Sequence, residues 1–143
     1  VEHRIEFVRT LNGVSYYNDS KATNTDSAIK ALEAFDGHII LIAGGDDKLT
    51  DLTEFMALVC ARCDELILVG DAAERFAAAA LDAGISAAQI HRAGYHMETA
   101  VRTAHALAAE GQTVLLSPAC ASFDMYGGYE ERGQDFKRIV NEL

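Results

Sequence analysis

The chain has 143 residues, half of them hydrophobic, and a formal net charge of −10 at pH 7. This length and composition suit one domain with a sizeable core. The negative charge argues against a nucleic-acid-binding protein, since phosphates require a basic surface. No apolar run approaches the roughly 20 residues of a membrane span, and Val1 to Arg4 does not begin a signal peptide. Three cysteines without disulfide density favour a cytoplasmic location.

Strand and helix patterns alternate along the chain. A hairpin is expected first, because two strand-like runs flank Asn12-Gly13, a strong turn signal. Apolar periodicity and glycine positions then predict the remaining elements. The expected elements are strands at 5–10 and 14–17, a helix at 28–35, a strand at 38–43, a helix at 51–59, a strand at 65–69, a helix at 72–83, a weak strand at 89–92, a helix at 97–107, a strand at 113–116 and a last helix from 129.

Two helix starts show the spacing of a capping box, in which side chains satisfy the free N–H groups of the first turn. Asp51 is followed by Glu54, and Asp71 is followed by Glu74. We therefore expect both aspartates to cap the helices that follow them.

The central strands are continuously apolar, as in the run His38 to Ala43. Such strands are typical of a parallel sheet that is covered on both faces. The sequence therefore predicts an α/β fold: a Rossmann-like, doubly wound, mostly parallel sheet with an N-terminal antiparallel hairpin and helices on both faces. No linker or internal repeat divides residues 1–143.

Three polar loops follow strands, at 18–25, 44–48 and 117–128. Ligands of open parallel sheets bind beyond the carboxyl ends of the strands, so these loops are expected to share one edge. That edge would carry two cations and two hydroxyls beside helix N-termini, namely Lys21, Lys48, Thr23 and Ser122. These groups suit carboxylates or phosphates. The sequence therefore predicts an anion site.

Aromatic side chains at Phe123 and Tyr129 would wall this site and shield its ion pairs from water. Each residue also has a purely structural interpretation. A single lysine is commonly a solvated surface group, and both aromatic rings can belong to the core. Thr23 can be a helix cap. Only the convergence of the loops favours the binding interpretation.

Other kinds of site are disfavoured. Cys60 and Cys63 have CxxC spacing but lie at the end of a predicted helix, whereas redox pairs sit at a helix start. The five histidines lack metal-ligand spacing, so no metal site is expected. Ser117 lacks the surroundings of a hydrolase nucleophile. Neither a G-x-G-x-x-G nor a P-loop motif is present, so the chain lacks its own phosphate cradle.

Three motifs together resemble one known family. They are the run Asn18 to Asn24, the pair Gly44-Gly45 with Lys48, and the run Ser117 to Asp124 followed by Tyr129 to Gly133. In order and spacing they are similar to the C-terminal domain of the Mur ligases that add D-glutamate, the UDP-N-acetylmuramoyl-L-alanine:D-glutamate ligases. The resemblance covers nearly the whole chain, and the run from Ser117 is its most specific part.

The resemblance implies a cytoplasmic, ATP- and Mg²⁺-dependent amide ligase of peptidoglycan synthesis, and through it a role in cell wall formation, cell shape and cell division. In that family ATP phosphorylates the alanyl carboxylate of the UDP-muramoyl substrate, and the amine of D-glutamate attacks the acyl phosphate. The family enzyme has a UDP-binding domain and a central ATPase domain, both absent here. We therefore expect this sequence, which lacks an initial methionine, to be one part of a longer protein and to be inactive alone.

Carried over by position, the resemblance implies a role for each matching residue. Lys21 corresponds to the lysine near the transferred phosphoryl and acyl groups. The positions that correspond to the D-glutamate pocket are Thr23, Lys48, Ser122, Phe123 and Tyr129. Those that correspond to contacts with ATP are Arg4 and Asp19. One departure is Asp47, where a glycine is common; it is expected to stiffen the loop or partly neutralise Lys48.

Two alternatives stay open at this stage. One is another ligase of the same fold, either a Mur ligase for a different amino acid or a folylpolyglutamate-synthase-like enzyme. The other is a non-catalytic module that binds a small molecule.

Overall fold

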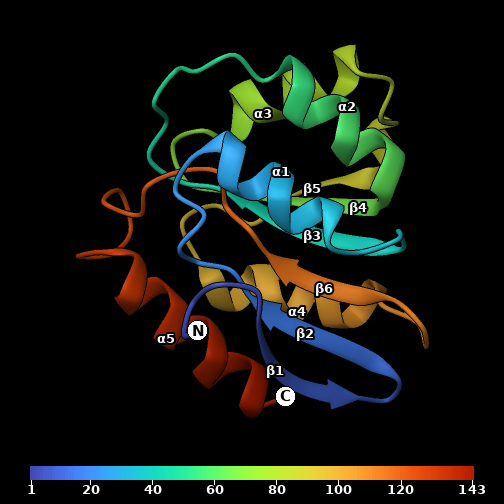
Figure 1. Cartoon of the computed structure of the whole chain (residues 1–143), viewed down its shortest axis with the longest axis vertical. Coiled ribbons are helices and arrows are strands. Elements are labelled where there is room, and N and C mark those ends of the chain that lie inside the picture. Colours follow the sequence, from blue (N-terminus) through green and yellow to red (C-terminus); the bar gives the residue numbers. More distant parts are fainter.

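A computed structural model describes all 143 residues. Six strands form one sheet in the order β1-β2-β6-β3-β4-β5 (Figure 1). The strands are β1 (Glu6–Leu11), β2 (Val14–Asn18), β3 (Ile39–Gly44), β4 (Cys63–Val69), β5 (Ile90–Arg92) and β6 (Thr113–Leu116). The first two are antiparallel and the other pairs are parallel. The predicted fold class is confirmed.

Five α-helices cover the two faces of this sheet. They are α1 (Thr25–Glu33), α2 (Thr53–Arg62), α3 (Ala73–Asp82), α4 (Met97–Leu107) and α5 (Tyr129–Asn141), with a short 3₁₀ turn at Ala87–Gln89. The first three pack on one face, and α4 and α5 pack on the other (Figure 1). None of the helices has the length and hydropathy needed to cross a membrane.

Strand β3 shows why its run of apolar residues is continuous. Ile39 and Leu41 point into the core beneath α1 to α3, while Ile40 and Ile42 point into the core beneath α4 and α5. Side chains alternate between the faces of a strand, so a strand covered on both sides must be apolar at every position.

The expected capping boxes are wrong. Helix α2 begins at Thr53 with Leu52 at its cap, and α3 begins at Ala73 with Ala72 at its cap, neither with a side-chain cap. Asp51 nevertheless accepts a hydrogen bond from the N–H of Thr53, the first residue of α2, at 2.8 Å, so it satisfies one free N–H group of that helix without forming a capping box. Asp71 accepts a hydrogen bond from the Tyr95 hydroxyl. Contacts with a neighbouring loop have displaced the local cap of α3.

Gly44 ends β3 in a conformation that favours glycine, with φ of +114°. A Cβ atom there would lie 2.1 Å from the carbonyl oxygen of Val69. We expect Gly44→Ala to lower the free energy of unfolding by about 3 kcal/mol, since it adds both backbone strain and a collision with a rigid strand. Urea denaturation of the chain measures this loss.

Gly111 provides the matched control, because its φ is +93° and a Cβ atom there would meet nothing within 4 Å. Gly111→Ala should therefore cost only the strain, about 1 kcal/mol. Equal losses for the two variants would show that the collision at Gly44 has no energetic weight.

Candidate functional site

Three neighbouring parallel strands bring the predicted loops together. The order of the sheet places β6 between β2 and β3, and Leu116 of β6 pairs with Asn18 and with Ile42. The loops that follow these strands leave the sheet at the same edge, on the left of Figure 1. The expected convergence of the three loops is confirmed.

Asp19 joins the first loop to the third. Its N–H donates to the Leu116 carbonyl at 2.7 Å, and its carboxylate accepts the Ser117 hydroxyl at 2.7 Å and the Ile5 N–H at 3.0 Å. Burial raises the pKa of this carboxyl group, and the hydrogen bonds from Ser117 and Ile5 only partly oppose that rise. Asp19 was predicted to contact ATP; its two oxygens serve internal hydrogen bonds, and its role toward a nucleotide stays a prediction.

The second loop is joined to the third by backbone hydrogen bonds. The Gly44 N–H donates to the Pro118 carbonyl at 3.0 Å, and the Asp46 N–H donates to the Ala121 carbonyl at 2.9 Å. A Cβ atom on Gly45 would lie 2.5 Å from that Ala121 oxygen. The glycine therefore permits the close approach of the two loops.

Asp47 anchors the second loop from its other side. Its carboxylate accepts two hydrogen bonds from Arg75, at 2.7 and 3.0 Å, and one from the Leu49 N–H at 2.9 Å. Arg75 also donates to the Thr50 carbonyl at 2.9 Å. Of the two expected effects of Asp47, the structure favours stiffening of the loop, because the partner of its charge is Arg75 rather than Lys48.

We expect Asp47→Asn to lower the free energy of unfolding by about 1 kcal/mol, the upper range for a partly exposed pair. The hydrogen bonds from Arg75 lower the pKa of Asp47 below its ordinary value. The stabilisation is therefore present above the ordinary carboxyl pKa and is lost as the pH falls through the lowered folded-state pKa. Urea denaturation at pH 7 and at acid pH measures it; a loss that does not shrink at acid pH would contradict this explanation.

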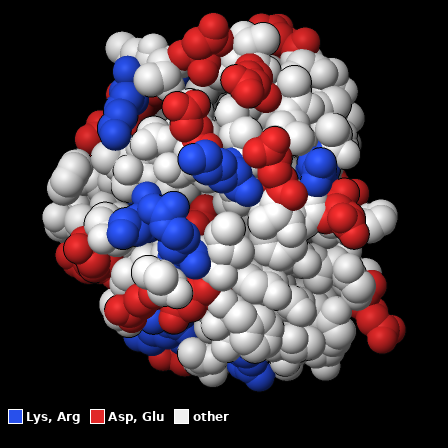
Figure 2. Space-filling model, viewed as in Figure 1, with Lys and Arg blue, Asp and Glu red and all other residues white.

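The cations of the edge are not paired with carboxylates of the chain. Lys21 is half-buried, Lys48 and Arg4 are exposed, and none of the three forms an ion pair. In Figure 2, most of the positive side chains on this face lie toward the side where the loops are, and acidic side chains lie between them. In a chain with net charge −10, these groups remain available for an anionic ligand.

The predicted hydroxyls differ in their surroundings. Asn24, not Thr23, caps α1 by accepting the Ser27 N–H at 2.9 Å, so the cap interpretation of Thr23 is wrong. Thr23 itself is half-buried. Ser122 is 2% exposed, and its hydroxyl has no hydrogen-bond partner. A buried hydroxyl without a partner costs free energy. A ligand would reach it only after a shift of the surrounding loop, and this contact stays a prediction.

The two aromatic residues lie at the outer end of the third loop. Phe123 is 69% exposed, so the interpretation that it belongs to the core is wrong. Tyr129 begins α5, half-buried, with its ring edge against His3 at a centroid distance of 5.9 Å. Their contact with a ligand stays a prediction.

Three further observations concern a surface hollow, possible metal ligands and the CxxC pair. A surface hollow of about 520 Å³ lies between the starts of α1 and α2, but Lys21, Lys48 and Ser122 do not line it. No group of three His, Cys, Asp or Glu side chains has the geometry of a metal site. Burial raises the pKa of the Cys63 thiol, which favours a structural over a redox role for the CxxC pair.

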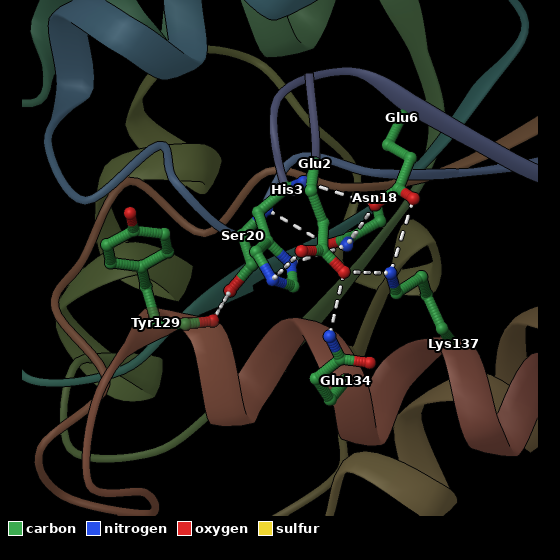
Figure 3. A network of polar contacts seen from close by, with 8 residues as sticks. All are labelled: Glu2, His3, Glu6, Asn18, Ser20, Tyr129, Gln134 and Lys137. Atoms are coloured by element: carbon green, nitrogen blue, oxygen red, sulfur yellow. Dashed lines mark hydrogen bonds and ion pairs between the residues drawn. The ribbon is translucent and has the colours of Figure 1, made fainter.

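Sequence reasoning missed the network that attaches the N-terminal segment (Figure 3). Lys137 of α5 bonds to Glu2 at 2.7 Å and to Glu6 at 3.2 Å. The buried His3 bonds to Asn18 at 2.9 Å, and its carbonyl accepts the Lys21 N–H at 2.9 Å. The N-terminal segment thus fixes the backbone at Lys21. The only feature of the local sequence that could have indicated this network is the polar character of residues 2–6.

Comparison with known proteins gives the family. A family model described as "Mur ligase, glutamate ligase domain" matches residues 3–120. Curated relatives named UDP-N-acetylmuramoylalanine–D-glutamate ligase include those of Geotalea uraniireducens, 50% identical over 141 residues, and Clostridioides difficile, 47% identical over 143 residues. These alignments cover 99% and 100% of this chain. The chain spans only 30% and 31% of the lengths of these relatives.

Solved structures agree on the fold. A MurF ligase from Thermotoga maritima in complex with ADP matches with a TM-score of 0.58, covering 99% of this chain and 32% of its own. A bifunctional folylpolyglutamate synthase/dihydrofolate synthase from Yersinia pestis matches with a TM-score of 0.64, covering 98% and 31%. Both are 16% identical to this chain and therefore support the fold alone. By its family model and its close relatives, the chain belongs to the Mur ligase family, as a glutamate ligase domain.

Proposed function

We propose that this chain is the C-terminal domain of a three-domain ligase that adds D-glutamate to UDP-N-acetylmuramoyl-L-alanine in the cytoplasm, for peptidoglycan synthesis. The UDP-binding and central ATPase domains would belong to the same protein. Curated relatives named for this reaction, at 47–50% identity, support the choice of D-glutamate over the amino acids of other ligases of this fold. The chain spans about a third of the length of these relatives, which supports the proposal that the full protein has additional domains.

The observation that carries the proposal is the convergence of the loops after β2, β3 and β6 at one edge. This edge joins unpaired cations with a buried hydroxyl that lacks a partner. D-Glutamate carries two carboxylates, which require such donors. Lys48 with Thr23 would hold one carboxylate. Ser122 and the backbone of Phe123 would hold the other, with Tyr129 beside them.

In the proposed reaction, the alanyl carboxylate takes the terminal phosphoryl group of ATP, which leaves ADP and an acyl phosphate. The D-glutamate amine then attacks the acyl carbon, the C–O bond to phosphate breaks, and the amine loses a proton as the amide forms. Lys21 would stabilise the negative charge that develops on the transferred and acyl oxygens. Arg4 and Asp19 would contact ATP when the domains close.

We assign Mg²⁺ mainly to the proposed central domain, because Mg²⁺ in phosphoryl-transfer enzymes is held by few carboxylates together with the phosphates of the nucleotide. Mg²⁺ would there neutralise phosphate charge during the transfer.

The experiment that tests this function uses the full-length protein with UDP-N-acetylmuramoyl-L-alanine and ATP. Phosphate release is followed with D-glutamate, L-glutamate, L-lysine and meso-diaminopimelate as separate acceptors. The proposal expects turnover with D-glutamate and little with the others. Preferential turnover of another amino acid would identify a different ligase, and no turnover with tight ligand binding would identify a non-catalytic module.

The 143-residue chain alone should hydrolyse no ATP and form no amide. Its sequence has no P-loop motif, the usual cradle for the phosphates of ATP. A coupled assay for ADP release from the purified chain checks this expectation. ADP release above that of a heat-denatured sample would contradict it.

A further inference from the structure

Arg132 is a buried charge at the centre of the three loops. It lies in the first turns of α5 and is 2% exposed. Its guanidinium donates to the Ser20 hydroxyl at 2.8 Å, to the Ser20 carbonyl at 2.7 Å and to the Cys120 carbonyl at 3.0 Å. One side chain therefore holds the loop after β2 and the loop after β6.

The second loop, after β3, packs against the same group. A Cβ atom on Gly45 would lie 3.5 Å from Nη1 of Arg132. Ser20, in turn, donates its hydroxyl proton to the Tyr129 carbonyl at 2.8 Å. The planar guanidinium thus fills the space that the loops enclose, and its fork of donors sets their spacing.

The positive charge of Arg132 has no carboxylate partner. Its hydrogen-bond acceptors are neutral oxygens, and it takes part in no ion pair. Burial lowers the pKa of Arg132 to about 10, so the group still carries its charge at neutral pH. Buried charges are ordinarily paired, because desolvation is expensive. The charge of the nearby Asp124 opposes this lowering of the pKa, but no carboxylate forms an ion pair with Arg132.

We infer that Arg132 is a positioning residue: by fixing Ser20 and Cys120 it sets the distance between Lys21 and Ser122 that D-glutamate and the reacting acyl group require. Lys21 directly follows Ser20, and Ser122 lies two residues after Cys120. A shift of either loop therefore moves a proposed ligand contact. The inference rests on the proposed function, since it concerns the two substrate contacts of that reaction.

The test uses the full-length ligase with Arg132→Lys, which keeps a charge but cannot supply the three-bond fork. The kcat/KM for D-glutamate should fall by about 100-fold, the loss typical of a displacement of about 1 Å. The KM for the UDP-linked substrate should stay near its wild-type value, because the other domains bind that substrate. A merely structural role would lower thermal stability without this selective change.

Arg138→Lys is the matched control, because Arg138 lies on the same helix but is exposed and pairs with Asp135 and Glu142. It should change kcat/KM less than twofold. Ser20→Ala removes one acceptor of Arg132 and should act in the same direction, by about tenfold. In the double variant the two losses should not multiply, since both break the same contact.

The outcomes are distinct. A folded Arg132→Lys enzyme with kcat/KM for D-glutamate within threefold of wild type would overturn the inference. So would independent, multiplying losses in the double variant. If Arg132→Lys does not fold, Ser20→Ala decides, and unchanged kinetics for that variant would overturn the inference. A wild-type enzyme without D-glutamate ligase activity would instead refute the proposed function.

Discussion

In the full-length protein, we expect Lys21→Ala to lower kcat by about 100- to 1000-fold and to leave the KM for D-glutamate nearly unchanged. This is the loss expected when one preorganised group that stabilises developing negative charge is removed. Lys21 has no carboxylate partner, and the bond of its N–H to the His3 carbonyl fixes its backbone. Steady-state phosphate release at saturating substrates measures the change.

Lys30→Ala is the matched control, since Lys30 is an exposed lysine on the neighbouring helix α1. It removes the same charge from the same part of the chain and should change kcat less than twofold. A Lys21→Ala enzyme with kcat within threefold of wild type would remove Lys21 from the reaction.

Lys48→Ala should instead raise the KM for D-glutamate by about 10- to 100-fold and lower kcat far less. The effect equals about 1.4 to 2.7 kcal/mol, around the lower limit of the range for truncating one partner of a buried charge pair, because Lys48 is exposed before the ligand binds. A change confined to KM would mean that Lys48 contributes to binding rather than to the chemical step. Initial rates over a range of D-glutamate concentrations separate the two constants.

Leu49→Ala controls for disturbance of the same loop, because Leu49 is 76% exposed and carries no charge. Its KM for D-glutamate should remain within twofold of wild type. An unchanged KM and kcat in Lys48→Ala would exclude Lys48 from the pocket.

The fold could be predicted from sequence because its strongest signals are local. The runs in β3 and β6 are apolar without interruption, which requires cover on both faces of the sheet. Asn12 and Gly13 both have positive φ, as the hairpin turn between β1 and β2 demands. The parallel direction of the strands then places the loops that follow them at one edge of the sheet.

Contacts between distant residues could not be predicted. Asp71 has the spacing of a helix cap, but its N–H donates to the carboxylate of Asp124, 53 positions away, at 2.9 Å. Arg132 lies in a motif that the sequence analysis recognised, yet its partner Ser20 is 112 positions away. Asp47 and Arg75 are similarly remote. Local patterns specify elements, whereas these bonds depend on how the loops meet.

The exposure of the site residues could not be predicted from the sequence either. Phe123 and Ser122 are neighbours in the sequence, but the first is 69% exposed and the second 2% exposed. The turn of the third loop decides this difference, and a pattern of residue types does not report it. The same turn leaves the Ser122 hydroxyl without a partner.

The central claim is that the loops after β2, β3 and β6 form one D-glutamate site. A crystal structure of the full-length enzyme with D-glutamate, UDP-N-acetylmuramoyl-L-alanine and a non-hydrolysable ATP analogue tests it most directly. The account predicts D-glutamate with its carboxylates on Lys48 and Ser122 and its amine facing the acyl group beside Lys21. D-Glutamate bound elsewhere, with Lys48 and Ser122 free of contact to it, would contradict the account.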